Sequence, residues 1–304
     1  MNKNIFVVGP TCSGKNDFAY QLSKYFKIEI INCDSIQVYK DIEILSNRPN
    51  KIEEKIVPHY LYGYIQNKNF SVQKWIQDVS QLLPQIRSRG SVPVFVGGTG
   101  LYVQSLIEGI SNIPEIKKTF KDQASLMISS KGIDYSINYL NKFYKQSFFP
   151  KDTHRLTNRL AFCLQYNDII ENYYGDKKSL TPDSLVVQVF KPKRELYEFA
   201  EKRFDKMIKN GAIEEARKIS EYKEVSKTLL KAHGLPELIE YTKSRLSLDD
   251  AIFKAKTNTK RYIKRQFTWW NNQNFSNLNY RTYFKKSFAN EVIKNISIYL
   301  KNEQ

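Results

Sequence analysis

The sequence predicts an α/β fold with a parallel-sheet core, a helical insertion domain and a helical C-terminal region. The first hundred residues alternate short β-branched runs with amphipathic stretches, which is typical of a parallel sheet with helices on both faces. The alternation is absent from about Pro114 to Pro182 and then returns with one strand-like run. We therefore expect the core to comprise residues 1–113 and 185–304, and the insertion to comprise residues 114–184.

Each element of the core has its own signal. Apolar runs and helical spacing predict strands at 4–8, 28–32, 92–96 and 185–190, and helices at 15–26 and 72–89. Gly90 should end the second helix, and Pro84 should kink or break it. From Arg194 onward the pattern is helical, with breaks at Gly211 and Gly234. The chain should therefore end in a group of helices.

The composition indicates a folded, basic protein. Of 304 residues, 48 are Lys or Arg and 31 are Asp or Glu, which gives a net charge of +17. This excess indicates an anionic partner, although an AT-rich genome, whose codons often encode lysine, explains it equally well. The three cysteines (Cys12, Cys33, Cys163) are widely spaced, which argues against disulfides or a zinc site and favours a reducing compartment. No apolar run approaches the roughly 18 residues that span a bilayer, so we expect no membrane partner. Together with the cysteine usage this favours the cytoplasm, and we expect a monomer there.

The strongest motif is the loop after the first strand, which reads Gly9-Pro10-Thr11-Cys12-Ser13-Gly14-Lys15-Asn16. It has the G-x-x-x-x-G-K spacing between a strand and a helix, so its backbone N–H groups and Lys15 can hold a phosphate. The core should therefore be P-loop NTPase-like. The residue after the lysine usually has a hydroxyl that contacts Mg²⁺, and here it is Asn16. Its amide oxygen can ligate such an ion directly or through water, which makes Asn16 the candidate metal ligand.

The second chemical signal is one carboxylate at the end of the second strand. A hydrolysing NTPase usually ends a later strand in a metal-binding acid, but the strand at 92–96 runs into Gly97-Gly98-Thr99-Gly100, which offers a hydroxyl instead. Asp34 follows the strand at 28–32, at the edge where open α/β sheets bind ligands. A carboxylate beside a cationic phosphate site suits a general base, and the alternative is a cap for a following helix.

Five segments, in order along the chain, resemble the tRNA dimethylallyltransferase (IPP transferase) family. They are residues 9–15, 34–39, 57–59, 97–102 and 259–269. The resemblance implies transfer of a dimethylallyl group from dimethylallyl diphosphate to N6 of adenosine 37, beside the anticodon of tRNA, with Mg²⁺ as cofactor. It implies that Asp34 is the general base, that Thr99 lies near the reaction centre, and that Lys15 and Arg203 bind the diphosphate.

The charge pattern near the C-terminus favours a nucleic-acid partner. Between Asp250 and Glu291 the sequence has nine Lys or Arg residues and no acid. Lys256, Lys260 and Lys264 are spaced to share one helical face. A solvated face normally mixes both signs, so the one-sided stretch indicates contact with the tRNA anticodon arm. The aromatic residues of this stretch are more typical of a core than of a base-stacking surface.

The predicted tRNA contacts come from both parts of the chain. In the insertion, residues 150–159 resemble a family segment with two arginines three apart, but the second position is Asn158 and Arg159 follows one residue late. Gln37 can pair with an adenine edge, and Gly234 either approaches RNA closely or ends a helix. The full predicted set is Asp34, Ser35, Ile36, Gln37, Thr99, Lys117, His154, Arg155, Asn158, Arg159, Gly234, Lys264, Arg265, Gln266, Thr268 and Trp269.

Three alternatives remain open from the residues. An adenylate dimethylallyltransferase acting on free AMP or ADP shares the core motifs but does not need the basic C-terminal stretch. A nucleoside or small-molecule kinase also has a P-loop followed by an acid, although the missing hydroxyl at Asn16 argues against it. The third alternative is an RNA-binding protein with a decayed phosphate loop.

Overall fold

The computed structural model describes residues 3–111, 113–144, 152–175, 177–273, 275, 279–283 and 286–301. The chain folds as two compact units, one of Met1–Glu108 with Ser179–Gln304 and one of Gly109–Lys178. The second unit therefore begins and ends earlier than the predicted 114–184. Leu180 and Thr181 belong to the first unit because their backbone N–H groups donate to the carbonyl of Leu106.

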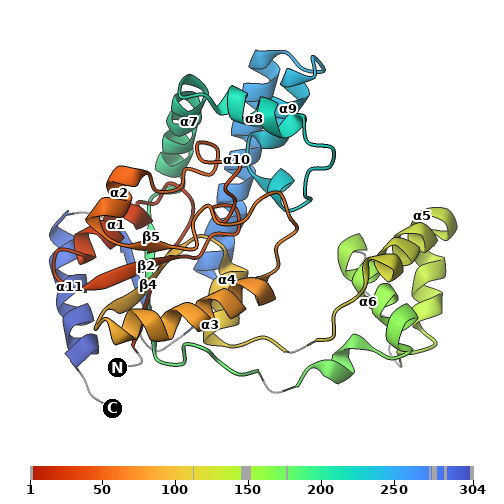
Figure 1. Ribbon diagram of the computed structural model, residues 1–304, viewed down its shortest axis with the longest axis horizontal. Helices are drawn as coiled ribbons and strands as arrows, with labels where there is room; N and C mark the ends of the chain where they lie inside the picture. Colours follow the sequence, from red (N-terminus) through yellow and green to blue (C-terminus); the bar gives the residue numbers. More distant parts are fainter. Residues whose placement is uncertain are drawn as a thin grey trace. The chain divides into compact units, whose positions relative to one another are not determined.

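The first unit is built on a six-stranded sheet in which all paired strands are parallel, in the order β3-β2-β4-β1-β5-β6 (Figure 1). The strands are β1 (Asn4–Val8), β2 (Ile28–Asn32), β3 (His59–Tyr60), β4 (Val92–Gly97), β5 (Ser184–Phe190) and β6 (Asn279–Tyr283). The predictions for β1 and β2 are confirmed, and β4 and β5 are each one residue longer than predicted. Because β2, β4 and β1 are neighbours, the loops that follow their carboxyl ends meet at one edge of the sheet.

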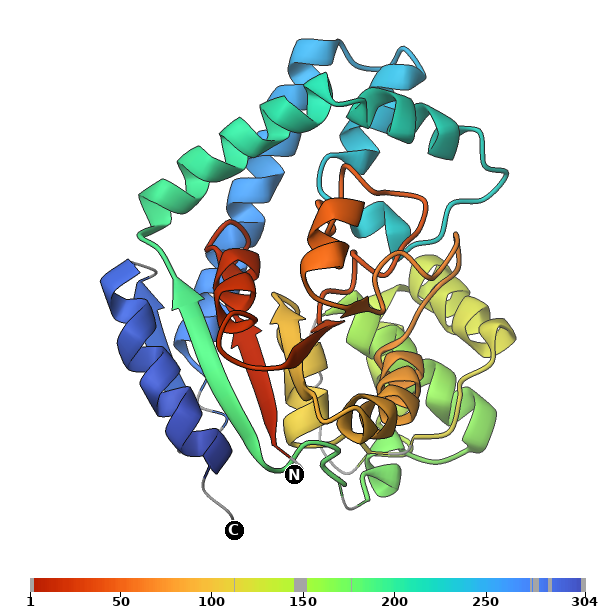
Figure 2. The same ribbon diagram turned by 60° about the vertical axis from the view of Figure 1, so that its left-hand side comes forward.

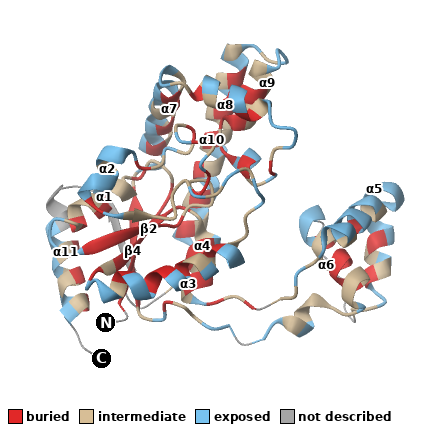
Figure 3. Cartoon of the chain, in the orientation of Figure 1, coloured by how far each residue is buried: buried red, intermediate tan, exposed pale blue. Residues whose placement is uncertain are grey.

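Side chains of β1, β2, β4 and β5 alternate between two apolar layers, whose buried residues are among those coloured red in Figure 3. Ile5 and Val7 point into a layer with helices α1 (Lys15–Leu22) and α11 (Lys286–Lys301). Phe6 and Val8 point into a layer with α3 (Val72–Ser88), α4 (Gly100–Ile107) and the end of α10 (Leu248–Asn271). This arrangement confirms the prediction of helices on both faces of a parallel sheet.

Helix α3 continues through Pro84, so Pro84 does not break it, and the predicted kink stays a prediction. Pro84 lies on the exposed face, where the carbonyl that loses its helical partner can be hydrated. Gly90 ends the helix as predicted, with a φ of 69°. The N–H groups of Gly90 and Ser91 return to the carbonyls of Arg87 and Ile86, which is a Schellman cap. Helix α1 ends four residues before its predicted end at Phe26.

A group of helices packs on the segment that follows β2. It comprises α7 (Lys193–Lys209), α8 (Ala212–Ser220), α9 (Leu235–Thr242) and α10, with a 3₁₀ turn at Leu229–Lys231. Helices α7 and α10 run side by side, as Figures 1 and 2 both show. Val38, Tyr39, Ile42 and Leu45, from the segment after β2, are buried against these helices. Short helix α2 (Lys51–Ile56) follows that segment.

The second unit is helical, as predicted. It contains α5 (Lys118–Leu140), α6 (Thr153–Tyr166) and a 3₁₀ turn at Ile170–Tyr173. Gly132 interrupts α5 with a φ of 85° and a ψ of 170°. The unit has its own apolar core, centred on Leu140, Leu156 and Leu160. Among the described residues of the whole chain, no helix is long and apolar enough to cross a membrane.

Candidate active site

The phosphate loop connects β1 to α1 in a conformation that favours glycine at two positions. Gly9 and Gly14 have φ values of 145° and 97°, and Cys12 has a φ of 65°. A Cβ atom on Gly9 would lie 2.2 Å from the carbonyl oxygen of Val189 in β5. Gly14 is the N-cap of α1, so the first N–H groups of the helix face the loop. The loop therefore offers backbone donors to an anion at the edge of the sheet.

Two basic side chains reach this loop from different elements. The Lys15 ammonium donates to the carbonyl of Pro10 at 2.7 Å. Burial lowers the pKa of Lys15 to about 8, and the nearby Asp34 carboxylate acts in the opposite direction. Arg203, from α7, donates to the hydroxyl of Thr11 at 2.9 Å. Both predicted diphosphate-binding cations therefore lie at the phosphate loop.

Asp34 and Thr99 are fixed next to each other at the ends of β2 and β4. The Asp34 carboxylate accepts a hydrogen bond from the N–H of Ile36 at 2.9 Å. The residues after Asp34 form a turn and not a helix, so the alternative role as a helix cap is excluded. The Thr99 hydroxyl accepts from the N–H of Ser35 at 3.0 Å, which ties the two strand ends together.

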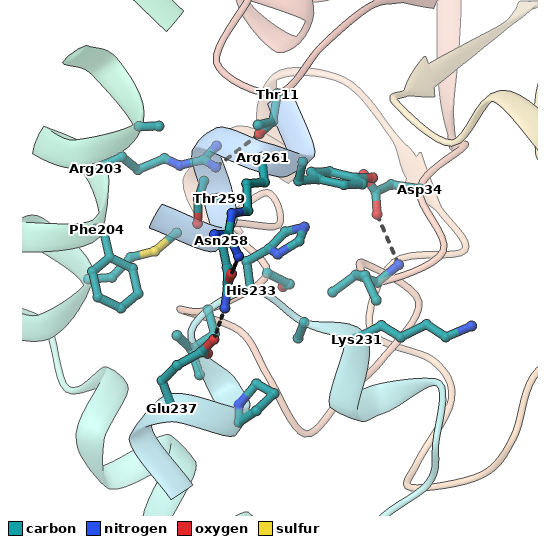
Figure 4. Close-up of a pocket in the computed structure, with 18 of the residues that line it drawn as sticks. Thr11, Asp34, Arg203, Phe204, Lys231, His233, Glu237, Asn258, Thr259 and Arg261 are labelled. Atoms are coloured by element: carbon teal, nitrogen blue, oxygen red, sulfur yellow. Dashed lines mark hydrogen bonds between the residues drawn. The ribbon is translucent and has the colours of Figure 1, made fainter. Parts of the chain in front are cut away.

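Two cavities meet at Asp34. The phosphate cavity, of about 380 Å³, is lined by the loop residues Thr11, Cys12, Lys15 and Asn16, among others. The helical cavity, of about 460 Å³, lies toward α7, α9 and α10. Both cavities are lined by Thr11, Asp34, Ser46 and Arg203. In Figure 4, Arg203 reaches from α7 to Thr11 on one side of the helical cavity, and Asp34 stands on the other.

The helical cavity contains polar groups that the sequence did not single out. His233 lines it, and its ring packs on Tyr262 with a centroid distance of 4.2 Å. Burial lowers the pKa of His233 to about 4, with further lowering by Arg265 and Arg203, so the imidazole is neutral at pH 7. Asn258 donates to Glu237 at 2.6 Å in the same cavity. No sequence pattern marks His233 except its place beside Gly234.

Comparisons with known proteins identify the family. The sequence model of the IPP transferase family matches residues 37–273. The tRNA dimethylallyltransferase of Wolbachia pipientis wMel is 37% identical over 280 residues, which cover 90% of this chain and 93% of the relative. That of Pelagibacter ubique is 36% identical over 275 residues and covers 88% of both chains. The chain belongs to the tRNA dimethylallyltransferase family.

Solved structures agree with this family. The tRNA isopentenylpyrophosphate transferase of Bacillus halodurans has a TM-score of 0.73 at 26% identity, over 99% of this chain and 97% of that one. A eukaryotic dimethylallyltransferase acting on tRNA has a TM-score of 0.72 at 26% identity, over 88% of this chain and 69% of that one. This chain is therefore an enzyme of the dimethylallyltransferase class, with a P-loop-type α/β core, and the alternatives drawn from the residues find no support.

Gln266, one of the predicted tRNA contacts, is held by other groups of the protein. It is 6% exposed, and its carbonyl oxygen accepts from the N–H of Thr11 at 2.9 Å. Its amide nitrogen donates to the carbonyl of Gly98 and to the hydroxyl of Tyr262, each at 2.9 Å. Because protein partners use both ends of the amide, Gln266 supports the phosphate loop, and its contact with tRNA stays a prediction.

Other residues near the end of α10 do form an accessible basic surface. Arg261, Lys264, Arg265, Thr268 and Trp269 line an open hollow of about 630 Å³. Four of these five were predicted as tRNA contacts. The Trp269 ring also packs on Trp270, with centroids 4.6 Å apart, and a Cβ on Gly100 would lie 2.2 Å from it. The ring is thus partly buried against the core, as Phe267 is, whereas Trp270 is fully buried in it.

The predicted lysine face is only partly free. Lys256 pairs with Asp205 at 2.6 Å, and Lys260 pairs with Glu201 at 2.5 Å, both acids lying on α7. Lys264 is exposed. The acid-free stretch in the sequence is therefore neutralised in part by a neighbouring helix. Arg281, Lys285 and Lys286, from the same stretch, have side chains outside the part of the structure that is described.

Gln37 and Gly234 have structural partners. Gln37 donates to the carbonyls of Ser46 and Asn47 at 3.1 and 3.0 Å. Gly234 has a φ of 88° and begins α9, so it does not end a helix. A Cβ there would lie 2.4 Å from the Phe204 ring, which explains the glycine by packing. Ser35 and Ile36 line the helical cavity, where contact with an acceptor nucleotide stays a prediction.

In the second unit, some of the side chains predicted to contact tRNA are exposed, and others form hydrogen bonds within the unit. Lys117, His154 and Arg155 are exposed. The Asn158 amide lies 3.4 Å from the His154 ring nitrogen, one helical turn away. Arg159 donates twice to Glu171, at 3.0 and 2.7 Å. Arg159 is thus held inside the unit, which argues against its taking the role of the arginine missing at position 158.

Proposed function

We propose that this chain transfers the dimethylallyl group of dimethylallyl diphosphate to N6 of adenosine 37 in tRNA, with Asp34 as the general base. The observation that carries the proposal is the position of Asp34 where the phosphate cavity and the helical cavity meet. A carboxylate there can face a diphosphate donor on one side and an adenosine acceptor on the other. The products are N6-(dimethylallyl)adenosine and diphosphate.

The phosphate loop would bind the diphosphate and stabilise it as a leaving group. The N–H groups at the start of α1 face the loop, and Lys15 and Arg203 add two positive charges. With a pKa of about 8, Lys15 is mostly protonated at neutral pH, and a bound anion would keep it so. These donors oppose the negative charge that develops as the bond between the prenyl carbon and oxygen breaks.

Asp34 would accept the proton that the attacking nitrogen loses. The N6 lone pair forms a bond to C1 of the prenyl group, the C1–O bond breaks, and diphosphate departs with that bonding pair. The N6 proton passes to the Asp34 carboxylate, whose orientation the Ile36 N–H fixes. Thr99 holds the backbone of Ser35 and thereby supports the same turn.

Mg²⁺ fits this site only as an ion carried largely by the diphosphate. No group of three His, Cys, Asp or Glu side chains in the described part of the chain could hold a metal ion. Asn16 lines the phosphate cavity and is the side chain that would complete the shell, since Mg²⁺ commonly takes one or two protein ligands together with phosphate oxygens. When bound, the ion would neutralise diphosphate charge.

The tRNA would contact the basic hollow at the end of α10 and the exposed residues of the second unit. Arg261, Lys264 and Arg265 offer cations for backbone phosphates. Lys117, His154 and Arg155 are the corresponding exposed side chains of Gly109–Lys178. We place the reaction in the cytoplasm because the substrate is tRNA and all three cysteines are free. We also propose a monomer, which size-exclusion chromatography with light scattering tests.

The direct test supplies labelled dimethylallyl diphosphate with three acceptors in parallel: an unmodified tRNA transcript, AMP and ADP. Mass spectrometry of the digested tRNA should show the added group on adenosine 37 alone, with no product from free nucleotides. Equal labelling of AMP or ADP would favour the adenylate transferase. Tight tRNA binding without product at every Mg²⁺ concentration would favour a non-catalytic RNA-binding protein.

A further inference from the structure

Glu215 binds a loop far from it in sequence. It lies in the first turn of α8, and both of its carboxylate oxygens accept hydrogen bonds from the backbone. Oε1 accepts from the N–H groups of Glu43 and Ile44, at 2.5 and 2.9 Å, and Oε2 accepts from the N–H of Leu45 at 2.8 Å. Three successive N–H groups thus converge on one carboxylate, and Figure 2 shows the helix beside that loop.

The bound loop forms part of the wall between the two cavities. Leu45 lines the helical cavity, Asn47 lines the phosphate cavity, and Ser46 lines both. The same loop supplies the carbonyls of Ser46 and Asn47 that accept from the Gln37 amide. Gln37 itself lines the phosphate cavity, three residues after Asp34. The conformation of the loop therefore determines where the Gln37 side chain is held.

The chemistry of this contact is specific for a carboxylate. An ionised carboxylate only accepts hydrogen bonds, and three backbone donors match its two oxygens. Burial raises the pKa of Glu215, whereas the three N–H donors and Arg48 act in the opposite direction. The amide of glutamine would direct two N–H donors at a backbone that is itself donating.

We infer that Glu215 is a positioning residue for the transfer reaction, because its carboxylate fixes the loop at Glu43–Leu45, and Leu45 and Ser46 of that loop line the helical cavity that would take the acceptor. The inference rests on the proposed function, since it assumes that an adenosine enters beside Asp34. Glu215 does not touch either cavity itself. Leu45, whose N–H group Glu215 accepts from, lines only the helical cavity, so the effect of Glu215 should appear chiefly in how well the acceptor is used.

The test is a double-mutant cycle of Glu215→Gln and Gln37→Ala, with Glu214→Gln as matched control. Glu214 is the adjacent residue of α8 and pairs on the surface with Arg217 at 2.8 Å. Steady-state transfer rates are measured on each variant after titration of active enzyme, once with tRNA varied at saturating dimethylallyl diphosphate and once with dimethylallyl diphosphate varied at saturating tRNA. Glu215→Gln should lower kcat/KM for tRNA by about tenfold, leave the KM for dimethylallyl diphosphate unchanged, and show little additional loss when combined with Gln37→Ala.

The kinetic results separate a positioning role of Glu215 from a purely structural one. Additive losses in the double variant, or a Glu215→Gln variant equal to Glu214→Gln, would overturn the inference. A loss of active enzyme with unchanged KM values for both substrates would mean that Glu215 only stabilises the fold. If Glu215→Gln does not fold, Glu215→Asp, which keeps the charge, should show an intermediate loss confined to tRNA. Failure of the wild-type chain to modify tRNA would instead reject the proposed function.

Discussion

Replacing Gln266 by leucine should weaken diphosphate binding and leave tRNA binding intact. The substitution keeps the side chain of similar size but replaces the polar amide by an apolar group, which removes three hydrogen bonds, to Thr11, Gly98 and Tyr262. A buried group that loses its partner costs about 1–3 kcal/mol. Thr11 lines both cavities and can be rehydrated there, and Gly98 keeps a long bond from Trp270 at 3.4 Å, so the lower end of that range applies to each.

Together these costs destabilise the binding conformation of the phosphate loop by about 2 kcal/mol. This free energy corresponds to about a 30-fold decrease in kcat/KM for dimethylallyl diphosphate. The assay is steady-state transfer at saturating tRNA with varied diphosphate, together with tRNA binding measured without the donor. Thr268→Val is the control, because this exposed residue lies two positions further along α10 and should affect tRNA alone. The reasoning is refuted if Gln266→Leu weakens tRNA binding while the KM for the diphosphate stays at the wild-type value.

Two further predictions concern charge and packing. The KM for dimethylallyl diphosphate should be constant below pH 8 and rise above it, because the free enzyme binds the anion with Lys15 protonated and its pKa is about 8. Lys15→Met should abolish that pH dependence, and a persistent rise in the variant would assign it to another group. Gly234→Ala should lower the free energy of unfolding by about 2–4 kcal/mol for two reasons. The new Cβ would clash with the Phe204 ring, and alanine is strained at the positive φ of this position. Gly90→Ala is the control, because a Cβ at this position has no atom within 4 Å, and it should lower the free energy of unfolding by only about 1–2 kcal/mol. Equal losses of stability for the two variants in thermal denaturation would contradict the packing argument.

The core strands could be predicted because each is an apolar run buried on both faces. β1 and β2 have the predicted bounds for this reason. β3 has only two residues and was not predicted, because so short a segment carries no periodicity. β6 was also missed, since its sequence, Asn279–Tyr283, lacks an apolar run.

Residues at the strand ends could likewise be placed from sequence. Lys15, Asp34 and Thr99 each follow a parallel strand, and parallel strands end at one edge of the sheet. Contacts that depend on helix packing could not be placed. The pattern on α10 cannot show that α7 supplies acids to Lys256 and Lys260 from some fifty residues away. For the same reason, neither the support that Gln266 gives to the phosphate loop nor the hydrogen bonds of Glu215 had a signal in the sequence.

The central claim is that Asp34 removes the N6 proton during transfer to tRNA. Asp34→Asn tests it most directly, because the amide keeps the size of the side chain and cannot serve as the base. The single-turnover rate of dimethylallyl transfer at saturating tRNA and dimethylallyl diphosphate should fall by about 10²–10⁴-fold, with unchanged dissociation constants for both substrates. A variant that transfers at close to the wild-type rate, or that loses tRNA affinity in proportion to its rate, would contradict the account.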